Sequence, residues 1–256
     1  DLDPQGNASS GLGLPRDPER SSVYTVVIDG QPTREAIIAG PIDNLWILPS
    51  DIALAGAEIE LISMPRREHR LAYALDGVAG EYDVVLVDCP PSLGLLTVNA
   101  LVAATHLVIP IQCEFYALEG LGHLTQTLDL VRRSSNPRLQ VLGIVMTLFD
   151  SRTTLSTQVV EEVRRSYPEL VFQTVIPRNV RLSEAPSYGQ SIAQYDPRSR
   201  GGQAYAALTA EVAARFWPPV FTKEVPMATT DPRTMLPEMA PSEPPAGDGA
   251  AAEGRR

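Results

Sequence analysis

Short apolar runs alternate with longer amphipathic stretches from residue 1 to about residue 217. The apolar runs predict five strands, at residues 45–48, 83–88, 106–111, 141–148 and 171–175. Between them, apolar positions recur at helical spacing in residues 54–62, 68–78, 95–103, 117–132, 154–167 and 202–216. This alternation is typical of strands joined by crossover helices. It predicts an α/β fold, with a mostly parallel sheet and helices on both faces.

The run Val84-Val85-Leu86-Val87 has no polar alternation, as expected of a central strand covered on both faces. It ends at Asp88, which precedes a stiff turn, Cys-Pro-Pro-Ser-Leu-Gly. Open parallel sheets bind ligands at the carboxyl ends of their strands. A carboxylate there can hold a water molecule of hydrated Mg²⁺ in a nucleotide hydrolase. By itself, an apolar run ending in Asp is more often a simple transition from strand to turn.

The opening loop offers two further carboxylates, because Asp1 and Asp3 flank Leu2 and precede Pro4-Gln5-Gly6. Pro4 restricts the backbone just after Asp3, so it can hold that carboxylate in one orientation. A fixed carboxylate near a metal-bound phosphate can orient and activate an attacking water molecule. The alternative is a polar turn in which the Asp side chains bond to nearby backbone groups.

Composition narrows the class of protein. A hydrophobic content of 44% over 256 residues can supply a sizeable core, and no apolar run approaches the length of a membrane span. The two cysteines, Cys89 and Cys113, show no metal-ligand spacing, and a reducing cytoplasm is expected. A formal charge of -10 argues against a protein that coats nucleic acid over its whole surface, but it leaves room for a local basic patch.

The organisation of the chain changes near Trp217. Residues 218–256 contain eight of the 23 prolines and end in an Ala/Gly-rich stretch. Such a segment cannot bury enough apolar surface to offset the entropy lost on ordering. The sequence therefore predicts one domain at residues 1–217 and a Pro/Ala-rich disordered tail at residues 218–256.

Three segments resemble the ParA/Soj family of chromosome- and plasmid-partitioning ATPases: Asp-Leu-Asp-Pro-Gln-Gly-Asn-Ala-Ser, Val-Asp-Cys-Pro-Pro-Ser-Leu-Gly-Leu-Leu-Thr-Val-Asn-Ala-Leu and Ile-Pro-Arg-Asn-Val-Arg-Leu-Ser-Glu-Ala-Pro-Ser. The resemblance runs from Asp1 to about Phe216. It implies a P-loop NTPase-like fold with ATP and Mg²⁺ as cofactors. It also implies a homodimer with ATP, non-specific DNA binding, stimulation of hydrolysis by a ParB-type partition protein, and a cytoplasmic, nucleoid-associated location without membrane binding.

The resemblance also implies roles for individual residues. Asp3 matches the family position that supports attack by water, and Asp88 matches the carboxylate that coordinates Mg²⁺ through water. Asp1 lies in the same loop and is a weaker metal candidate. The segments that approach the adenine correspond to Thr147, Pro177 and Arg178.

For DNA, the resemblance points to Arg181, Arg198 and Arg200. The residues alone leave other interpretations open, since Arg178 and Arg181 could pair with Glu184 or cap a helix. A basic loop before a final helix is also often only a solvated surface.

The chain departs from the family pattern at its beginning. It contains no Lys-Gly-Gly-Val-Gly-Lys-Thr-Thr type loop and no Gly-x-x-x-x-Gly-Lys segment, so it has no P-loop lysines. We therefore expect a protein truncated at its N-terminus that lacks the first strand, the P-loop and the first helix. We expect such a fragment to be inactive and to expose the edges of its strands.

Two other hypotheses remain open on the sequence, a related ATPase of the same superfamily and a module without catalytic activity. A MinD-like division-site ATPase would need a membrane-binding amphipathic helix at the C-terminus, which the proline-rich tail does not provide. A reductase similar to the nitrogenase iron protein would need paired bridging cysteines for an iron–sulfur cluster, and Cys89 with Cys113 does not offer that pattern. A non-catalytic DNA- or partner-binding module would fit a chain without phosphate-binding lysines.

Overall fold

The computed structural model describes residues 1–217, so the predicted disorder of the tail and its boundary lie outside the described residues. The helices are α1 (Asn7–Gly11), α2 (Thr33–Ala36), α3 (Leu54–Ser63), α4 (Arg70–Asp76), α5 (Leu95–Ala103), α6 (Ala117–Ser134), α7 (Thr154–Ser166), α8 (Val180–Glu184), α9 (Ile192–Tyr195) and α10 (Arg200–Phe216). The strands are β1 (Ile38–Ala39), β2 (Trp46–Ile47), β3 (His106–Gln112), β4 (Gln140–Phe149) and β5 (Val171–Pro177).

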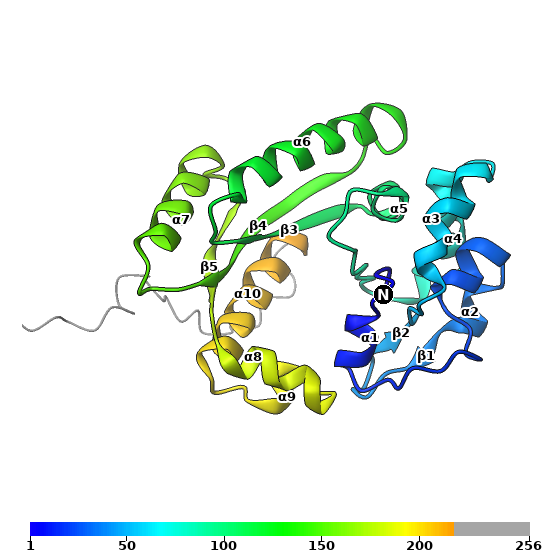
Figure 1. Ribbon diagram of the computed structural model, residues 1–256, viewed down its shortest axis with the longest axis horizontal. Helices are drawn as coiled ribbons and strands as arrows, with labels where there is room; N and C mark the ends of the chain where they lie inside the picture. The colour runs from blue at the N-terminus through cyan, green and yellow to red at the C-terminus, as the bar shows by residue number, and fades with distance from the viewer. Residues whose placement is uncertain (218–256) are drawn as a thin grey trace, which may run out of the picture.

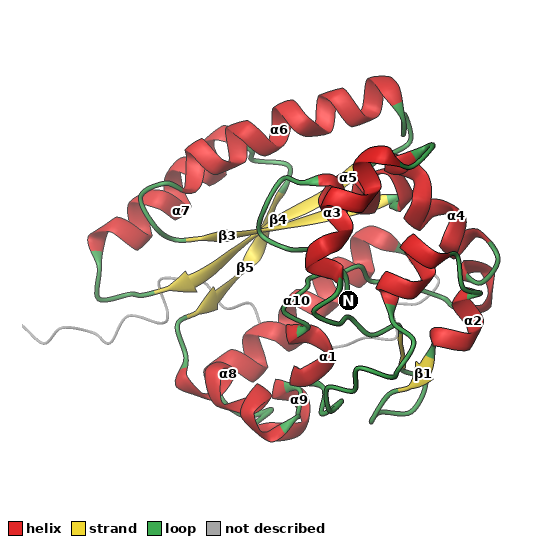
Figure 2. Ribbon diagram, turned by 45° about the vertical axis from the view of Figure 1, so that its right-hand side comes forward, coloured by secondary structure: helices red, strands yellow, loops and turns green. Residues whose placement is uncertain are grey.

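A three-stranded parallel sheet in the order β3-β4-β5 organises the C-terminal half. Helices α6 and α7 lie over one face of this sheet, and α10 lies over the other (Figure 1). Figure 2 shows the same layers with the strands in yellow between the helices. The predicted α/β class, with parallel strands and helices on both faces, is confirmed.

The sheet is held from both sides by apolar side chains. Ile144 and Met146 of β4 belong to the cluster that packs under α6 and α7, whereas Val145 points to the other cluster, with Phe172 and Ala204. Alternation along the strand sends successive side chains to opposite faces, and both faces are covered here. The unbroken apolar run of β4 is therefore explained by burial on both sides.

Arg215 of α10 fastens this helix to the sheet. Its guanidinium carbon lies 4.2 Å from the centre of the Phe172 ring, and its nitrogens donate to the carbonyls of Leu142, Leu170 and Val171 at 2.9–3.1 Å. A planar guanidinium can stack on a ring and donate in its own plane at the same time. Arg215 therefore joins α10 to the sheet both by hydrogen bonds and by the contact with the Phe172 ring.

The N-terminal half has its own core, and α5 joins it to the sheet. Leu96 and Ala100 of α5 pack with Leu2, Leu54 and other residues of the N-terminal half, while Leu101 and Val102 belong to the core around the sheet. A helix with apolar side chains all round is typical of a buried element. Helix α5 thus connects the two cores.

The predicted strand at residues 83–88 is wrong. This segment forms no ladder in the part of the chain that the structure describes, and Leu86 is 88% exposed. A strand exists only where a neighbour pairs with its backbone, and the single backbone hydrogen bond recorded here joins the Leu2 amide to the Asp88 carbonyl at 2.8 Å. Most of the apolar run is therefore exposed, and only Val87 packs against the N-terminal core.

The predicted strand at residues 45–48 is partly wrong. It is reduced to the two residues of β2, which pair antiparallel with β1 outside the parallel sheet. The other three predicted strands are confirmed as β3, β4 and β5. The long predicted helices are also confirmed, although residues 68–78 divide between a short turn at Arg67–His69 and α4. Helices α1, α2, α8 and α9 were not predicted, because helices of four or five residues are too short to show periodicity.

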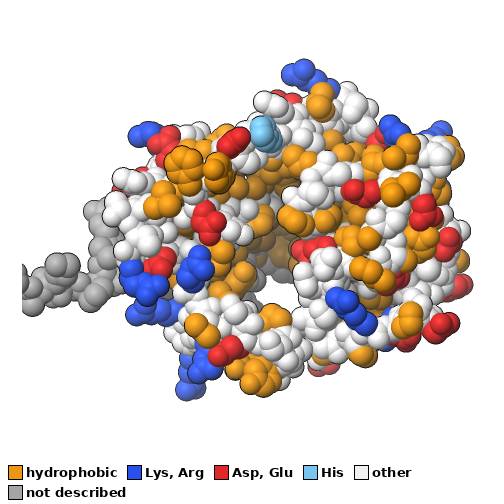
Figure 3. Space-filling view, viewed as in Figure 1, with side chains coloured by type: hydrophobic (Ala, Val, Ile, Leu, Met, Phe, Trp, Pro, Cys, Tyr) orange, Lys and Arg blue, Asp and Glu red, His pale blue; other side chains and the backbone are white. Residues whose placement is uncertain are grey.

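The two halves also meet where α1 approaches the turn after α8. A Cβ atom added to Gly189 would lie 2.7 Å from the Cα of Gly13, and both glycines have positive φ, 63° and 82°. Only residues without a side chain allow this close approach. Between this contact and α5, the space-filling view shows an opening through the molecule (Figure 3).

Candidate functional site

Residues 1–3 are hydrogen-bonded to two other segments of the chain, one at Leu48 and one at Asp88. The amino group of Asp1 donates to the Leu48 carbonyl at 3.0 Å, and the Leu2 amide donates to the Asp88 carbonyl at 2.8 Å. Leu2 itself is 1% exposed and belongs to the N-terminal core. The structure therefore places the loop that carries Asp1 and Asp3 next to the backbone of Asp88.

The loop that carries Asp3 is tightly bonded to itself. The Asp3 carbonyl accepts from the Gly6 amide at 2.8 Å, and the Oδ1 atom of Asp3 accepts from the Gln5 amide at 2.9 Å. Gly6 has φ of 64°, the left-handed conformation that favours glycine, and α1 begins at the next residue. The polar turn considered from the sequence is thus present. This turn restrains the Asp3 side chain, and Asp3 is half-buried.

Asp1 is engaged differently. Its Oδ2 atom accepts from both the amide and the hydroxyl of Ser9, at 2.8 and 2.7 Å, and its Oδ1 atom lies 3.3 Å from the Asp3 amide. A carboxylate with these partners is well satisfied without a metal ion. The contacts favour a role for Asp1 in fastening the loop to α1.

Asp88 remains the better candidate to face a hydrated cation. No hydrogen bond to its carboxylate occurs within residues 1–217, and the residue is exposed. Although the residue as a whole is exposed, protein atoms around its carboxyl displace water and so raise the pKa of this group; the Asp1 amino group opposes that shift, and the Asp3 carboxylate adds to it. A nearby divalent cation would favour the ionised form.

Three or more potential metal-ligating side chains do not come together anywhere in the described residues. A closed site built only from protein ligands is therefore absent from this part of the chain. Mg²⁺ commonly keeps several water ligands and takes only one or two carboxylates, together with substrate phosphates. The single carboxylate of Asp88 fits contact of that open, water-mediated kind.

Cys89, next to Asp88, should react slowly with alkylating agents. Burial, assisted by the Asp88 carboxylate, raises the pKa of its thiol to about 11, and burial and Glu114 raise the pKa of Cys113 to about 11 as well. A raised pKa leaves the thiol protonated at pH 8, where it has roughly 100-fold less thiolate than an ordinary cysteine. Mass spectrometry with iodoacetamide should show this delay, with faster reaction toward pH 11.

The control for this prediction is the same chain unfolded in urea, in which both thiols should react like free cysteine. Rapid alkylation of Cys89 in the folded protein at pH 8 would contradict the shift.

A second group of predicted residues gathers at the carboxyl ends of β4 and β5. Phe149 pairs with Pro177 in the sheet register, and the Arg178 amide donates to the Phe149 carbonyl at 2.8 Å. The Thr147 hydroxyl donates to the Ile111 carbonyl of β3 at 3.1 Å. Thr147, Pro177 and Arg178 therefore share one edge of the sheet. No hydrogen bond or ion pair within residues 1–217 joins them to Asp3 or Asp88.

Charged residues that the sequence analysis did not single out lie at this same edge. Glu114 follows β3 and pairs with Arg178 at 3.6 Å. Asp150 follows β4 and pairs with Arg152 at 2.7 Å, and this hydrogen bond is the main reason why the pKa of Asp150 falls to about 2. Position directly after a predicted strand was the signal that could have identified them.

The predicted DNA-contacting residues lie near one another. Arg181 of α8 pairs with Glu184 at 2.8 Å and with Asp196 at 3.4 Å, which brings α8 against the loop before α10. The pairing with Glu184, left open from the sequence, is thus present. Arg198 and Arg200 are exposed and form no ion pair within residues 1–217. Arginine side chains gather over this part of the molecule, at the lower left of Figure 3.

Comparison with known proteins decides the family. The family model described as "AAA domain" matches residues 1–141. The sporulation initiation inhibitor protein Soj of Bacillus subtilis is 51% identical over 214 residues, covering 84% of this chain and 85% of that protein. The chain belongs to the ParA/Soj family of chromosome-partitioning ATPases. The chromosome partitioning protein ParA of Myxococcus xanthus is 49% identical over 218 residues, covering 85% of this chain and 77% of that protein.

Solved structures share the fold of this chain. A Mycobacterium smegmatis protein, described as cobyrinic acid a,c-diamide synthase with bound ADP and magnesium, is 37% identical with a TM-score of 0.70, covering 84% of this chain and 80% of that one. Apo McdA of Cyanothece has a TM-score of 0.75 at 18% identity, with 85% and 86% covered, and shows the fold alone. None of the helices in residues 1–217 has the length and apolar character needed to cross a bilayer.

Proposed function

We propose that this protein hydrolyses ATP with Mg²⁺ to drive the partitioning of DNA, chromosomal or plasmid. The observation that carries the proposal is the placement of Asp3 beside Asp88, held by the hydrogen bond between Leu2 and Asp88, in a chain of the ParA/Soj family. The M. smegmatis relative, crystallised with ADP and magnesium, supports the choice of cofactors.

Each carboxylate has a separate task in this proposal. Bound Mg²⁺ supplies charge neutralisation at the phosphates. Asp88 would help to hold the hydrated ion through one of its water ligands. Asp3 holds the attacking water molecule, because its loop is fixed by the bonds from Gln5 and Gly6. Thr147, Pro177 and Arg178, at the sheet edge, would border the adenine, and Asp1 fastens the loop.

The same proposal includes DNA and two kinds of protein partner. ATP would bridge two copies of the chain, and the exposed Arg198 and Arg200 with Arg181 of each copy would bind DNA phosphates. Two patches bind more tightly than one, since the second contact becomes intramolecular. A ParB-type protein would stimulate hydrolysis and thus release DNA. This activity belongs to a cytoplasmic protein associated with the nucleoid.

Arg200→Ala should weaken DNA binding equally for all sequences and reduce its salt dependence. Removing one phosphate contact lowers the slope of log affinity against log salt by about one. Fluorescence anisotropy with two unrelated duplexes at several salt concentrations measures this slope. Arg34→Ala is the matched control, because Arg34 is exposed and pairs with Glu81 outside the basic region. An unchanged slope for Arg200→Ala would remove this residue from the DNA surface.

The experiment that tests the whole proposal is ATP turnover with DNA and a cognate ParB-type protein. Because the chain contains no phosphate-binding lysine loop, we propose that the 256 residues alone are inactive. Extension upstream to an in-frame start codon should restore activity. If neither form binds or hydrolyses ATP while DNA binding persists, a non-catalytic DNA-binding module is the better description.

A further inference from the structure

We infer that Ser50 is a positioning residue for Asp3: it fixes the main chain of the loop that presents the carboxylate to the attacking water molecule. The Ser50 hydroxyl donates to the Asp3 carbonyl at 2.6 Å. Ser50 follows β2 and is 47 residues away from Asp3 in sequence, so this contact is made by the fold and not by the loop itself. The inference rests on the proposed role of Asp3.

The Asp3 carbonyl accepts two hydrogen bonds, one from Ser50 and one from the Gly6 amide at 2.8 Å. Two donors on one oxygen fix the orientation of the peptide plane between Asp3 and Pro4. Pro4 restricts its own φ angle. The side chain of Asp3 is in turn held by the Gln5 amide. Ser50 is thus the anchor from outside the turn in a set of bonds that leaves the carboxylate little freedom.

Ser50 also connects to Asp1 through Ser9. The Ser50 amide donates to the Ser9 hydroxyl at 3.3 Å, and that hydroxyl donates to the Asp1 carboxylate at 2.7 Å. Ser9 is only 6% exposed, so water competes little for these groups. One residue therefore holds the loop at two points, at Asp3 directly and at Asp1 through a buried hydroxyl.

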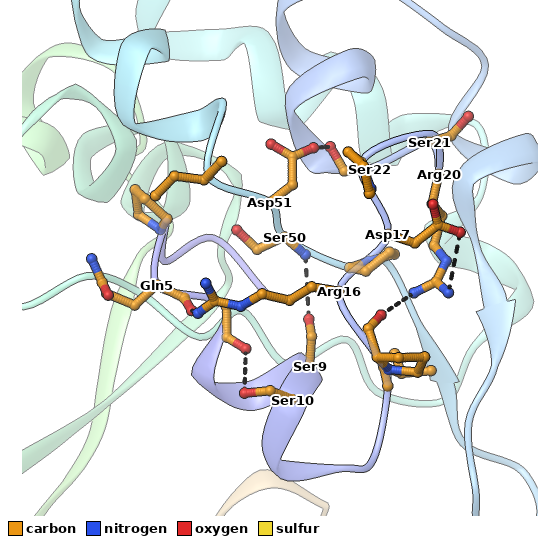
Figure 4. A pocket seen from close by; sticks show the side chains of 17 residues that line it. Gln5, Ser9, Ser10, Arg16, Asp17, Arg20, Ser21, Ser22, Ser50 and Asp51 are labelled. Atoms are coloured by element: carbon orange, nitrogen blue, oxygen red, sulfur yellow. Dashed lines mark hydrogen bonds and ion pairs between the residues drawn. The ribbon is translucent and has the colours of Figure 1, made fainter.

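Polar anchors matter here because packing is incomplete. The loop borders a cavity of about 130 Å³, lined in part by Gln5, Ser9 and Ser50 (Figure 4). Arg16, which also lines the cavity, donates to the Gln5 carbonyl at 2.9 Å, but Arg16 is exposed. Where a void replaces packed side chains, dispersion contacts are lost and hydrogen bonds carry more of the restraint. Ser50 is the more shielded of the two anchors.

The test combines amide exchange with kinetics. In the 256-residue chain, Ser50→Ala should speed hydrogen exchange of the Gln5 and Gly6 amides about five- to tenfold, as the loss of one hydrogen bond would. Amides of β4 should be unaffected. In the form that turns over ATP, kcat should fall about tenfold with KM unchanged, because the ground-state contacts to nucleotide remain. Ser50→Thr, which keeps the hydroxyl, should restore both.

Ser21→Ala is the matched control. Ser21 lines the same cavity, but its hydroxyl accepts from Gln31 and does not touch the Asp3 loop. Unchanged exchange at Gln5 and Gly6 in Ser50→Ala would overturn the inference, and so would faster exchange throughout the core. If Asp3→Ala kept full turnover, the proposed function of Asp3 would fail instead, while the exchange data would still decide whether Ser50 anchors the loop.

Discussion

Asp3→Ala should abolish ATP turnover in the form of the protein that hydrolyses ATP, while binding of ATP and DNA persists. The variant removes the carboxylate that holds the attacking water molecule and leaves Asp88 and the arginines in place. Loss of such a group commonly costs a factor of about 10² to 10⁴ in rate. Phosphate release at saturating ATP, with DNA and a ParB-type protein present, measures the effect. Nucleotide and DNA binding are measured separately.

Asp3→Asn sharpens this test. Asparagine keeps an oxygen that can accept from the Gln5 amide, so the turn is retained while the negative charge is lost. It should be nearly as inactive as Asp3→Ala if the charge is what matters. Asp43→Ala, at an exposed loop position, should behave like the parent. If Asp3→Ala hydrolysed ATP as fast as the parent protein, activation of the water molecule would not depend on this residue.

Phe172→Ala should be the most destabilising single change at the sheet. This side chain of β5 is fully buried with Val145 of β4 and Ala204 of α10, and its ring is the surface on which Arg215 stacks. Truncation of a buried Phe leaves a cavity and costs about 3–5 kcal/mol in free energy of unfolding. Here the stacking contact with Arg215 is lost as well. Urea denaturation followed by circular dichroism gives the shift in midpoint.

Phe115→Ala is the matched control for stability. It removes the same type of side chain, but Phe115 is 76% exposed, with its ring edge-on to that of Tyr116. Its effect should stay within about 0.5 kcal/mol, as for most surface substitutions. Equal effects of the two variants would mean that the contact between α10 and the sheet does not stabilise the fold as described.

The strand predictions are correct where an apolar segment pairs with another strand in the part of the chain that the structure describes. Strands β3, β4 and β5 are apolar runs that pair with one another, and each was predicted. Residues 83–88 are just as apolar, yet they form no ladder and leave Leu86 exposed. A high content of apolar residues indicates that a segment is suited to burial. Pairing and burial require a second segment at the right distance, which the pattern of one run does not encode.

The sequence by itself determined the family and the α/β class, because these depend on residue types in short, ordered segments. It also singled out Asp3 and Asp88 as candidate site residues. Only the tertiary structure decided which groups hold them. The Ser50 hydroxyl, 47 residues from Asp3, donates to the Asp3 carbonyl. The Ser9 hydroxyl donates to the Asp1 carboxylate, and the Arg215 guanidinium stacks on the Phe172 ring. Hydrogen bonds and ring contacts reach only a few ångströms, so they depend on the path of the folded chain and not on spacing along it.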